Sequence, residues 1–263
     1  MKIALITGAS SGIGRCYAEQ LASKGHNVLI ISNQREQNEQ VAETIERQYG
    51  VRAVALYADL AEVDAAEKIY DYCREQDFEV DILISNAGIL QFGQVLRMRD
   101  GLIEFINTLH CTTPAKLCRL FGTDMCNRRE GRILIMSSLT AWTPYPTISL
   151  YGATKVYLKS FAQSLWYEFR PYGVKVTTVY PGAVDTPLYK LDDKYRRLFR
   201  RLGVMLSPER LARSGLRAMF CGSRTCIPGL FAKIVVAICA VLPAHALLPV
   251  LKIPAIKRLL ARI

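Results

Sequence analysis

A tyrosine and a lysine stand four positions apart in the chain, as Tyr151 and Lys155. On a helix, side chains at this spacing share one face, so the lysine ammonium would lie beside the tyrosine phenol. A phenol with an ordinary pKa of about 10 exchanges protons slowly near neutrality, and a nearby cation lowers that pKa. The pair is therefore a candidate proton donor and acceptor, although a surface Tyr/Lys pair can have the same spacing.

Two further polar residues precede this pair. Ser138 follows the apolar run Ile133 to Met136, at the expected end of a strand, where its hydroxyl could donate to a substrate oxygen that gains negative charge. Asn107 lies in a stretch expected to be helical. Each also has a structural explanation, since a serine can cap a helix and an asparagine can bend one.

A glycine-rich loop lies near the N-terminus. Lys2 to Thr7 has the pattern of a strand and runs into Gly8-Ala9-Ser10-Ser11-Gly12-Ile13-Gly14, after which a helix is expected. Glycines at such a turn let the backbone approach a dinucleotide pyrophosphate at the helix N-terminus. A glycine cluster can also form an ordinary tight turn, so the loop alone only favours nucleotide binding.

The elements that position these residues alternate between short β-branched runs and amphipathic helical stretches. Val41, Ile45 and Tyr49 have helical spacing, and Gly50 is the expected helix stop. Alternation of this kind predicts an α/β fold, a Rossmann-type doubly wound parallel sheet in a single domain with a C-terminal apolar extension. The strand candidates are Ile3 to Thr7, Val28 to Ser32, Val51 to Tyr57, Ile82 to Ser85, Ile133 to Ser137 and Val174 to Tyr180.

Composition excludes several classes of protein. The chain has 263 residues, 51% hydrophobic and 22% charged, so it is not a disordered chain. Its formal charge of +11 should attract anions, but no nucleic-acid recognition motif is present and no nucleic-acid partner is expected. The eight cysteines are scattered without metal-ligand spacing, so we expect no metal and a reducing compartment. No signal peptide precedes the first strand, which favours the cytoplasm.

Six motifs in chain order resemble those of the short-chain dehydrogenase/reductase family. The resemblance runs from residue 2 to roughly residue 190, and one small departure is Ser85, where the family often has a first asparagine before Asn-Ala-Gly. The motifs are Thr7-Gly8-Ala9-Ser10-Ser11-Gly12-Ile13-Gly14, Asp59-Leu60, Asn86-Ala87-Gly88, Asn107, Ser138 with Tyr151-x-x-x-Lys155, and Pro181-Gly182-Ala183-Val184-Asp185-Thr186.

This resemblance implies a catalytic role for four residues. Tyr151 would exchange a proton with the substrate oxygen, Lys155 would also hold the nicotinamide ribose, Ser138 would bind the substrate oxygen, and Asn107 would hold a water that relays protons to Lys155. The resemblance also implies a homo-oligomer. The implied cofactor contacts are Gly8, Ser10, Ser11, Gly12, Ile13, Gly14, Asn33, Arg35, Asp59, Leu60, Asn86, Ala87, Gly88, Tyr151, Lys155, Pro181, Gly182, Val184 and Thr186.

The end of the second strand bears on the choice of cofactor. In the family, an acidic residue there favours NAD, and a basic residue favours NADP. Here the strand ends Ile30-Ile31-Ser32-Asn33 with no carboxylate, and Arg35 follows. NADP(H) is therefore favoured over NAD(H), although Arg35 could equally begin a solvated helix and Glu36 could offset its charge.

The chain departs from a minimal Rossmann unit after residue 182. We predict a catalytic domain over residues 1–226, a basic substrate lid over about 187–215, and an apolar and basic extension over 227–263. The apolar stretch Ile234 to Leu251 contains Pro243 and Pro249, which makes a clean membrane span doubtful. An interfacial segment with flanking cations is the better membrane interpretation, and an arm that closes the pocket or packs on a second subunit is the alternative.

These observations predict an oxidoreductase that interconverts a ketone and a secondary alcohol on a small hydrophobic substrate. A long-chain 3-keto lipid such as 3-ketosphinganine, or a steroid ketone, is the favoured class, and a cytoplasmic protein peripheral to a membrane is expected. One alternative is a soluble 3-oxoacyl-[acyl-carrier-protein] reductase. Another is a regulatory protein that senses nicotinamide without turnover.

Overall fold

The computed structural model describes residues 1–145, 147–185, 197 and 204–241. Seven parallel strands form one sheet in the order β3-β2-β1-β4-β5-β6-β9, within a single α/β domain. A short parallel pair, β7 with β8, stands apart from it. The strands are β1 (Lys2–Thr7), β2 (Val28–Ser32), β3 (Ala53–Tyr57), β4 (Glu79–Ser85), β5 (Gly131–Met136), β6 (Val174–Val179), β7 (Ala183–Val184), β8 (Met205–Leu206) and β9 (Thr225–Cys226).

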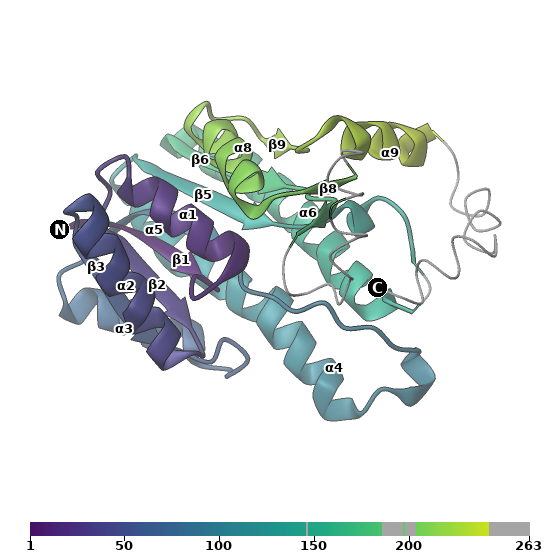
Figure 1. The fold of residues 1–263 in the computed structure, drawn as a ribbon, viewed down its shortest axis with the longest axis horizontal. Coiled ribbons are helices and arrows are strands. Elements are labelled where there is room, and N and C mark those ends of the chain that lie inside the picture. The colour runs from purple at the N-terminus through teal and green to yellow at the C-terminus, as the bar shows by residue number, and fades with distance from the viewer. Residues whose placement is uncertain (146, 186–196, 198–203, 242–263) are drawn as a thin grey trace.

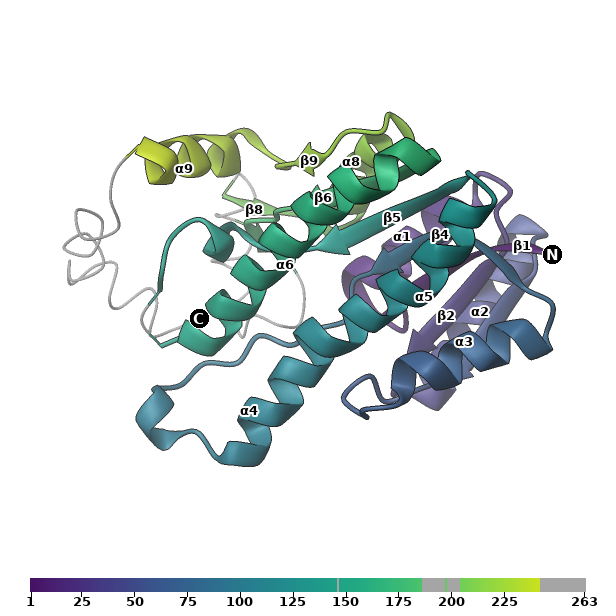
Figure 2. The ribbon, with the colours of Figure 1, turned by 180° about the vertical axis from the view of Figure 1, so that it is seen from behind.

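Helices cover both faces of the sheet. Figure 1 shows α1, α2 and α8 on one face, and Figure 2 shows α3, α5 and α6 on the other. Each face has its own cluster of buried apolar side chains, around Tyr17 and Leu216 on the first face and around Ile69, Phe121 and Leu158 on the second. The helices are α1 (Gly12–Ala22), α2 (Arg35–Tyr49), α3 (Ala65–Glu75), α4 (Asp100–Asn107), α5 (Thr113–Asn127), α6 (Ser149–Phe169), α8 (Pro208–Phe220) and α9 (Leu230–Val241).

The strand order positions the site. On one side of β1 lie β2 and then β3. On the other side lie β4, β5, β6 and β9 in that order. Loops leaving the carboxyl ends of β1 and β4 therefore diverge to opposite faces, and ligands bind in the crevice at such a switch point. The predicted doubly wound parallel sheet is confirmed.

Several sequence predictions can be compared with these bounds. All six predicted strands are present, and α2 ends at Gly50, whose φ of 67° is left-handed. The seventh strand, β9, was not predicted. Pro208 to Gly215, the last part of the segment expected to form a lid, lie in α8, where Leu211 and Leu216 are buried against the sheet. The rest of that segment from 187 to 203, apart from Arg197, lies outside the described residues.

Candidate active site

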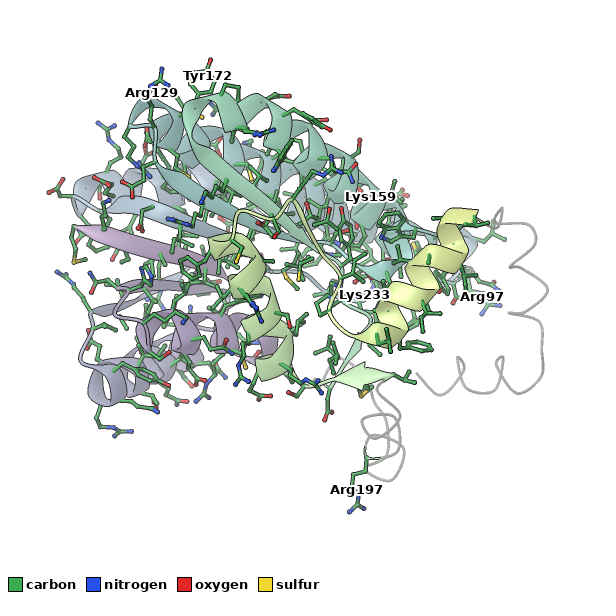
Figure 3. The ribbon with its side chains drawn as sticks, turned by 90° about the horizontal axis from the view of Figure 1, so that it is seen from above. Arg97, Arg129, Lys159, Tyr172, Arg197 and Lys233 are labelled. Atoms are coloured by element: carbon green, nitrogen blue, oxygen red, sulfur yellow. The ribbon has the colours of Figure 1, made fainter. Side chains whose placement is uncertain are left out.

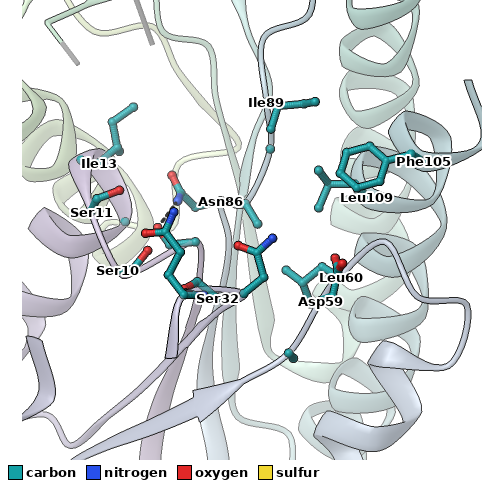
Figure 4. A pocket seen from close by; sticks show the side chains of 18 residues that line it. Ser10, Ser11, Ile13, Ser32, Asp59, Leu60, Asn86, Ile89, Phe105 and Leu109 are labelled. Carbon is teal, nitrogen blue, oxygen red and sulfur yellow. Dashed lines mark hydrogen bonds between the residues drawn. The ribbon is translucent and has the colours of Figure 1, made fainter. Parts of the chain in front are cut away.

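A cleft of about 480 Å³ opens at the carboxyl edge of the sheet, between the loops that follow β1, β2, β3 and β4 (Figure 4). This volume is in the usual range for a small-molecule or cofactor site. Ser32, at the strand end weighed for cofactor choice, also lines it, whereas the sequence had not indicated Gln34, Ala58, Ile89, Phe105 or Leu109. The predicted cofactor residues that line it are Gly8, Ser10, Ser11, Gly12, Ile13, Gly14, Asn33, Asp59, Leu60, Asn86, Ala87 and Gly88.

The glycine loop between β1 and α1 has no room for side chains at two positions. Gly8 has a φ of 66°, a conformation that L side chains rarely adopt. A Cβ on Gly14 would lie 2.1 Å from the carbonyl oxygen of Gly8. The loop thus brings bare backbone to the N-terminus of α1, where Ser11 makes no side-chain cap, which is the cradle that a pyrophosphate requires. The residues present fit a dinucleotide.

A single hydroxyl joins this loop to the one after β4. Thr7 Oγ1 accepts hydrogen bonds from the backbone N–H of Asn86 at 2.9 Å and of Ala87 at 3.0 Å. The Asn86 side chain donates in return to the Thr7 carbonyl oxygen at 3.0 Å. The Asn-Ala-Gly motif therefore fixes the loop after β4 against the glycine loop.

A buried asparagine fixes the end of β2, where Ser32 lines the cleft. The Ser32 hydroxyl donates to Asn38 Oδ1 at 2.6 Å, and Asn38 Nδ2 donates to the carbonyl oxygens of Ser32 and Leu56. Sequence reasoning missed Asn38. Asn33 is exposed in the cleft, and Arg35 begins α2 with its guanidinium 5.1 Å from the ring centroid of Tyr57.

Tyr151 and Lys155 share one face of α6, as predicted from their spacing. Lys155 is buried, and its Nζ lies 5.4 Å from the Tyr151 ring centroid and donates to the Met136 carbonyl oxygen at 3.1 Å. Burial lowers the pKa of the Lys155 amine to about 8. The Ser137 hydroxyl donates to the Lys155 carbonyl oxygen at 2.8 Å and so ties α6 to the end of β5.

Ser138 stands directly after Ser137. It precedes a three-residue turn, Leu139 to Ala141, and its Oγ accepts from the Thr140 N–H at 3.2 Å. The capping role weighed from the sequence is therefore present, but a hydroxyl that accepts keeps its own proton to donate. The next N–H, of Leu139, donates to the Pro181 carbonyl oxygen at 3.0 Å, which places the Pro-Gly turn beside Ser138.

The chain is similar to a family model, to curated relatives and to a solved structure. The family model described as short chain dehydrogenase matches residues 2–196. The chain belongs to the short-chain dehydrogenase family. The 17-beta-hydroxysteroid dehydrogenase type 3 of Mus musculus is 36% identical over 191 residues, 71% of this chain and 61% of the relative. The very-long-chain 3-oxoacyl-CoA reductase of Anas platyrhynchos is 34% identical over 195 residues, 72% of this chain and 61% of the relative.

A solved structure is similar over the whole chain. It is a short-chain dehydrogenase from Sphingobium yanoikuyae in complex with NADPH, with a TM-score of 0.78, 27% identity, and coverage of 100% of this chain and 96% of that one. The chain spans only 61% of the length of the two curated relatives. The chain is thus a member of a family that binds nicotinamide dinucleotides, and the predicted resemblance to ketoreductases of lipids and steroids is confirmed.

No hydrogen bond in the described part of the chain links the Asn107 side chain to the other predicted site residues of this short-chain dehydrogenase. Asn107 is the last residue of α4 and is exposed, and its side chain makes no hydrogen bond to any described residue. Three positions later, buried His110 packs its ring against Tyr151 at a centroid distance of 5.8 Å. Sequence reasoning missed His110, and the only indication was a histidine within an apolar helical stretch.

The remaining predicted residues do not line the cleft or lie outside the described part of the chain. Val184 is buried in β7, and Gly182 approaches the Leu139 side chain. Thr186 lies outside the described residues. The cysteine, histidine and acidic side chains of the described part of the chain form no cluster that could hold a metal ion.

Proposed function

We propose that the protein is an NADP(H)-dependent reductase that interconverts a hydrophobic ketone and its secondary alcohol. The observation that carries this proposal is the buried Lys155 amine held 5.4 Å from the Tyr151 ring centroid, at the sheet edge where the cleft opens. A bound nicotinamide supplies or accepts the hydride. The substrate classes we favour are long-chain 3-keto lipids, such as 3-ketosphinganine, and steroid ketones.

The protein residues handle the proton and the developing charge. The Tyr151 phenol donates its proton to the substrate oxygen as that oxygen becomes an alkoxide, and the Lys155 ammonium stabilises the phenolate that remains. The Ser138 hydroxyl donates to the same oxygen, so its hydrogen bond strengthens as the negative charge develops. Both roles reverse when the alcohol is oxidised.

The names of the relatives support the substrate class. One is named for a steroid and the other for a very-long-chain 3-oxoacyl group, both of which have a large apolar part. The C-terminal extension of this chain, residues 227–263, continues that apolar character beyond the catalytic domain of residues 1–226 that we propose. A homo-oligomer remains our expectation from the family.

The test is the oxidation of NADPH, followed by its absorbance, with purified protein and a panel of ketones. The panel holds 3-keto sphingoid bases, 3-oxoacyl thioesters of coenzyme A and of acyl carrier protein, and steroid ketones. Turnover of a sphingoid base or steroid supports the proposal. Turnover confined to the acyl-carrier-protein thioester identifies the soluble reductase instead, and tight NADPH binding without any turnover identifies a nicotinamide sensor.

The preference for NADPH should depend on Arg35. We expect Arg35→Glu to raise KM for NADPH by about 10-fold or more and to change KM for NADH by less than about 3-fold, because a carboxylate repels the 2′-phosphate that a guanidinium binds. Steady-state kinetics with both cofactors measure this. Arg47→Glu, an exposed arginine in the last turn of the same helix, is the matched control. An equal effect on both cofactors would show that Arg35 does not select the phosphate.

We also propose that the protein contacts a membrane surface through α9. Ala232 and Val236 of this helix are buried, whereas Leu230, Ile234 and Val241 on its other side are 75%, 50% and 81% exposed. Figure 3 shows α9 at the margin of the molecule, with Lys233 labelled. An apolar helix face on a protein of formal charge +11 suits an anionic lipid surface. None of the helices in the described ranges has the length and hydropathy needed to cross a bilayer.

Acidic substitutions on α9 should weaken binding to vesicles that contain phosphatidylserine. We expect Ile234→Glu with Ile238→Glu to lower the bound fraction by about 10-fold in co-sedimentation, because two apolar contacts become repulsive charges. Val63→Glu, at a 71% exposed position in the loop before α3, is the control and should bind like the wild type. If the double variant binds as well as the wild type, α9 is not the contact.

A further inference from the structure

His110 occupies an irregular turn between two helices. Residues Thr108–Thr112 form a π-helical turn that joins α4 to α5, and such turns occur frequently at functional sites. The His110 side chain is only 1% exposed and reaches the space between the loop after β4 and helix α6. Its surroundings therefore include both the Asn-Ala-Gly loop and the helix that carries Tyr151.

The hydrogen bonds of His110 fix its protonation state and direction. The Ile89 backbone N–H donates to Nε2 at 3.0 Å, so Nε2 has no proton and the ring proton is on Nδ1. Nδ1 lies 3.0 Å from Thr154 Oγ1 and donates to it, and the Thr154 hydroxyl in turn donates to the Tyr151 carbonyl oxygen at 2.8 Å. A continuous chain of hydrogen bonds thus runs from the loop after β4 to the backbone of Tyr151.

Packing and charge agree with a neutral imidazole here. The His110 and Tyr151 rings meet edge to face at an interplanar angle of 79°. A Cβ on Gly88 would lie 3.0 Å from Nε2, so the glycine of the Asn-Ala-Gly motif leaves space for the ring. Burial and the charge of Lys155 lower the pKa of His110 to about 3, which keeps the ring neutral at physiological pH.

We propose that His110 is a positioning residue that couples the loop of residues 86–89 to Tyr151, in addition to the catalytic residues Asn107, Ser138, Tyr151 and Lys155 expected from the sequence. This inference rests on the proposed function, since it takes Tyr151 as the proton donor and the loop as part of the cofactor site. The two ring nitrogens make different contacts. Nε2 accepts from the loop of residues 86–89, and Nδ1 donates to Thr154, which bonds to the Tyr151 backbone.

Two variants separate the Ile89 contact of Nε2 from the Thr154 contact of Nδ1. In His110→Gln, the side-chain amide can place its oxygen near the position of Nε2, so the Ile89 contact is kept and the Thr154 contact is lost. In His110→Asn, the shorter amide can place its NH₂ near the position of Nδ1, so the Thr154 contact is kept and the Ile89 contact is lost. His110→Phe keeps the ring against Tyr151 and removes both contacts.

Three measurements are made on each variant. They are the dissociation constant for NADPH from fluorescence, kcat for the best ketone of the panel, and the pH at which the Tyr151 phenol titrates. The last is read by NMR of protein labelled at tyrosine Cζ, with the Tyr151 resonance identified by its loss in Tyr151→Phe. It needs neither cofactor nor substrate.

We expect a crossed pattern. His110→Gln should lose about 10-fold in kcat, as expected when one buried hydrogen bond is removed, and keep its NADPH affinity. Its Tyr151 titration should move toward the ordinary pKa of about 10. His110→Asn should lose about 10-fold in NADPH affinity and keep its Tyr151 titration. His110→Phe should show both losses.

A purely structural role for His110 predicts a different result. NADPH affinity, kcat and the Tyr151 titration would then all change in proportion to the decrease in the thermal unfolding midpoint. That result overturns the inference, and so does the absence of a change in any of the three measurements. If the wild type reduces no ketone, the proposed function fails while the affinity and titration measurements still decide the role of His110. If a variant does not fold, the other amide variant supplies its half of the comparison.

Discussion

Tyr151→Phe should lower kcat for ketone reduction by about 10³-fold, in the middle of the range that general acid catalysis contributes. The phenylalanine ring keeps the contact with the His110 ring, and the Lys155 amine stays beside it. Only the hydroxyl proton is lost, so the dissociation constant for NADPH should stay within about 2-fold of the wild-type value. Single-turnover kinetics with the best ketone of the panel measure the chemical step.

A matched control for this substitution lies on the same helix. Tyr157 is also on α6 but is 40% exposed and stacks on Phe161 away from the cleft, so Tyr157→Phe should keep the wild-type kcat. If Tyr151→Phe retained more than about a tenth of the wild-type rate, another group would have to supply the proton. Cofactor binding without turnover in the wild type would instead favour the sensing role.

Lys155→Met should abolish turnover and yet stabilise the cofactor-free protein at pH 7. The amine is buried, and burial lowers its pKa from 10.5 to about 8. That difference corresponds to a cost of about 3 kcal/mol for holding the charged amine in the folded state at neutral pH. Methionine has a similar length and no charge, although it leaves the Met136 carbonyl oxygen without its Lys155 donor, so we expect a net gain of about 1–2 kcal/mol.

The direction in which the free energy of unfolding changes with pH is a second check on the cost of burying the Lys155 charge. Between pH 8 and pH 10.5 the unfolded chain holds a proton on Lys155 that the folded chain has lost, so the wild type gains stability as pH rises through this window. Below pH 8 both states are charged and the full cost remains. The advantage of Lys155→Met over the wild type should therefore shrink between pH 8 and pH 10.5.

Urea unfolding of wild type and variant at pH 7 and at pH 10 measures this difference, in which the titration of other groups cancels. Lys175→Met, at an exposed position in β6, is the control and should show no such pH-dependent gap. A Lys155→Met variant that is less stable than the wild type at pH 7 would show that the hydrogen bond to Met136 outweighs the cost of burying the charge.

The catalytic pair and the glycine loop could be predicted because both depend on local spacing. Tyr151 and Lys155 are four residues apart on a continuous helix, and the loop from Gly8 to Gly14 lies between a strand and the helix that follows it. Neither feature requires knowledge of a distant contact. The strand-helix alternation likewise determined the doubly wound sheet, because a crossover between parallel strands has few possible arrangements.

The places where prediction failed involve interrupted periodicity or long-range contacts. The π turn of residues 108–112 interrupts the helical periodicity, so the contacts of His110 could not be predicted from a continuous helix. Asn38 gains its role from hydrogen bonds to Ser32 at the end of β2 and to a carbonyl oxygen on the neighbouring strand β3. β9 is two residues long, too short for any alternation to be detected.

The α8 helix could have been recognised more fully. Leu211, Ala212, Leu216 and Met219 recur at helical spacing, and Pro208 after the capping Ser207 is typical of a helix start. A segment with this periodicity belongs to the buried scaffold, and its substitution should affect folding more than substrate choice.

The Thr7 hydroxyl has a consequence for how the cleft accepts a ligand. Because one oxygen atom joins the glycine loop to the loop after β4, the surfaces for the two ends of an elongated ligand cannot move apart independently. Folding already orders these two surfaces, so ligand binding does not lose conformational entropy to align them. Association should then proceed in a single kinetic phase without a slow isomerisation, and its heat capacity change should reflect surface burial alone.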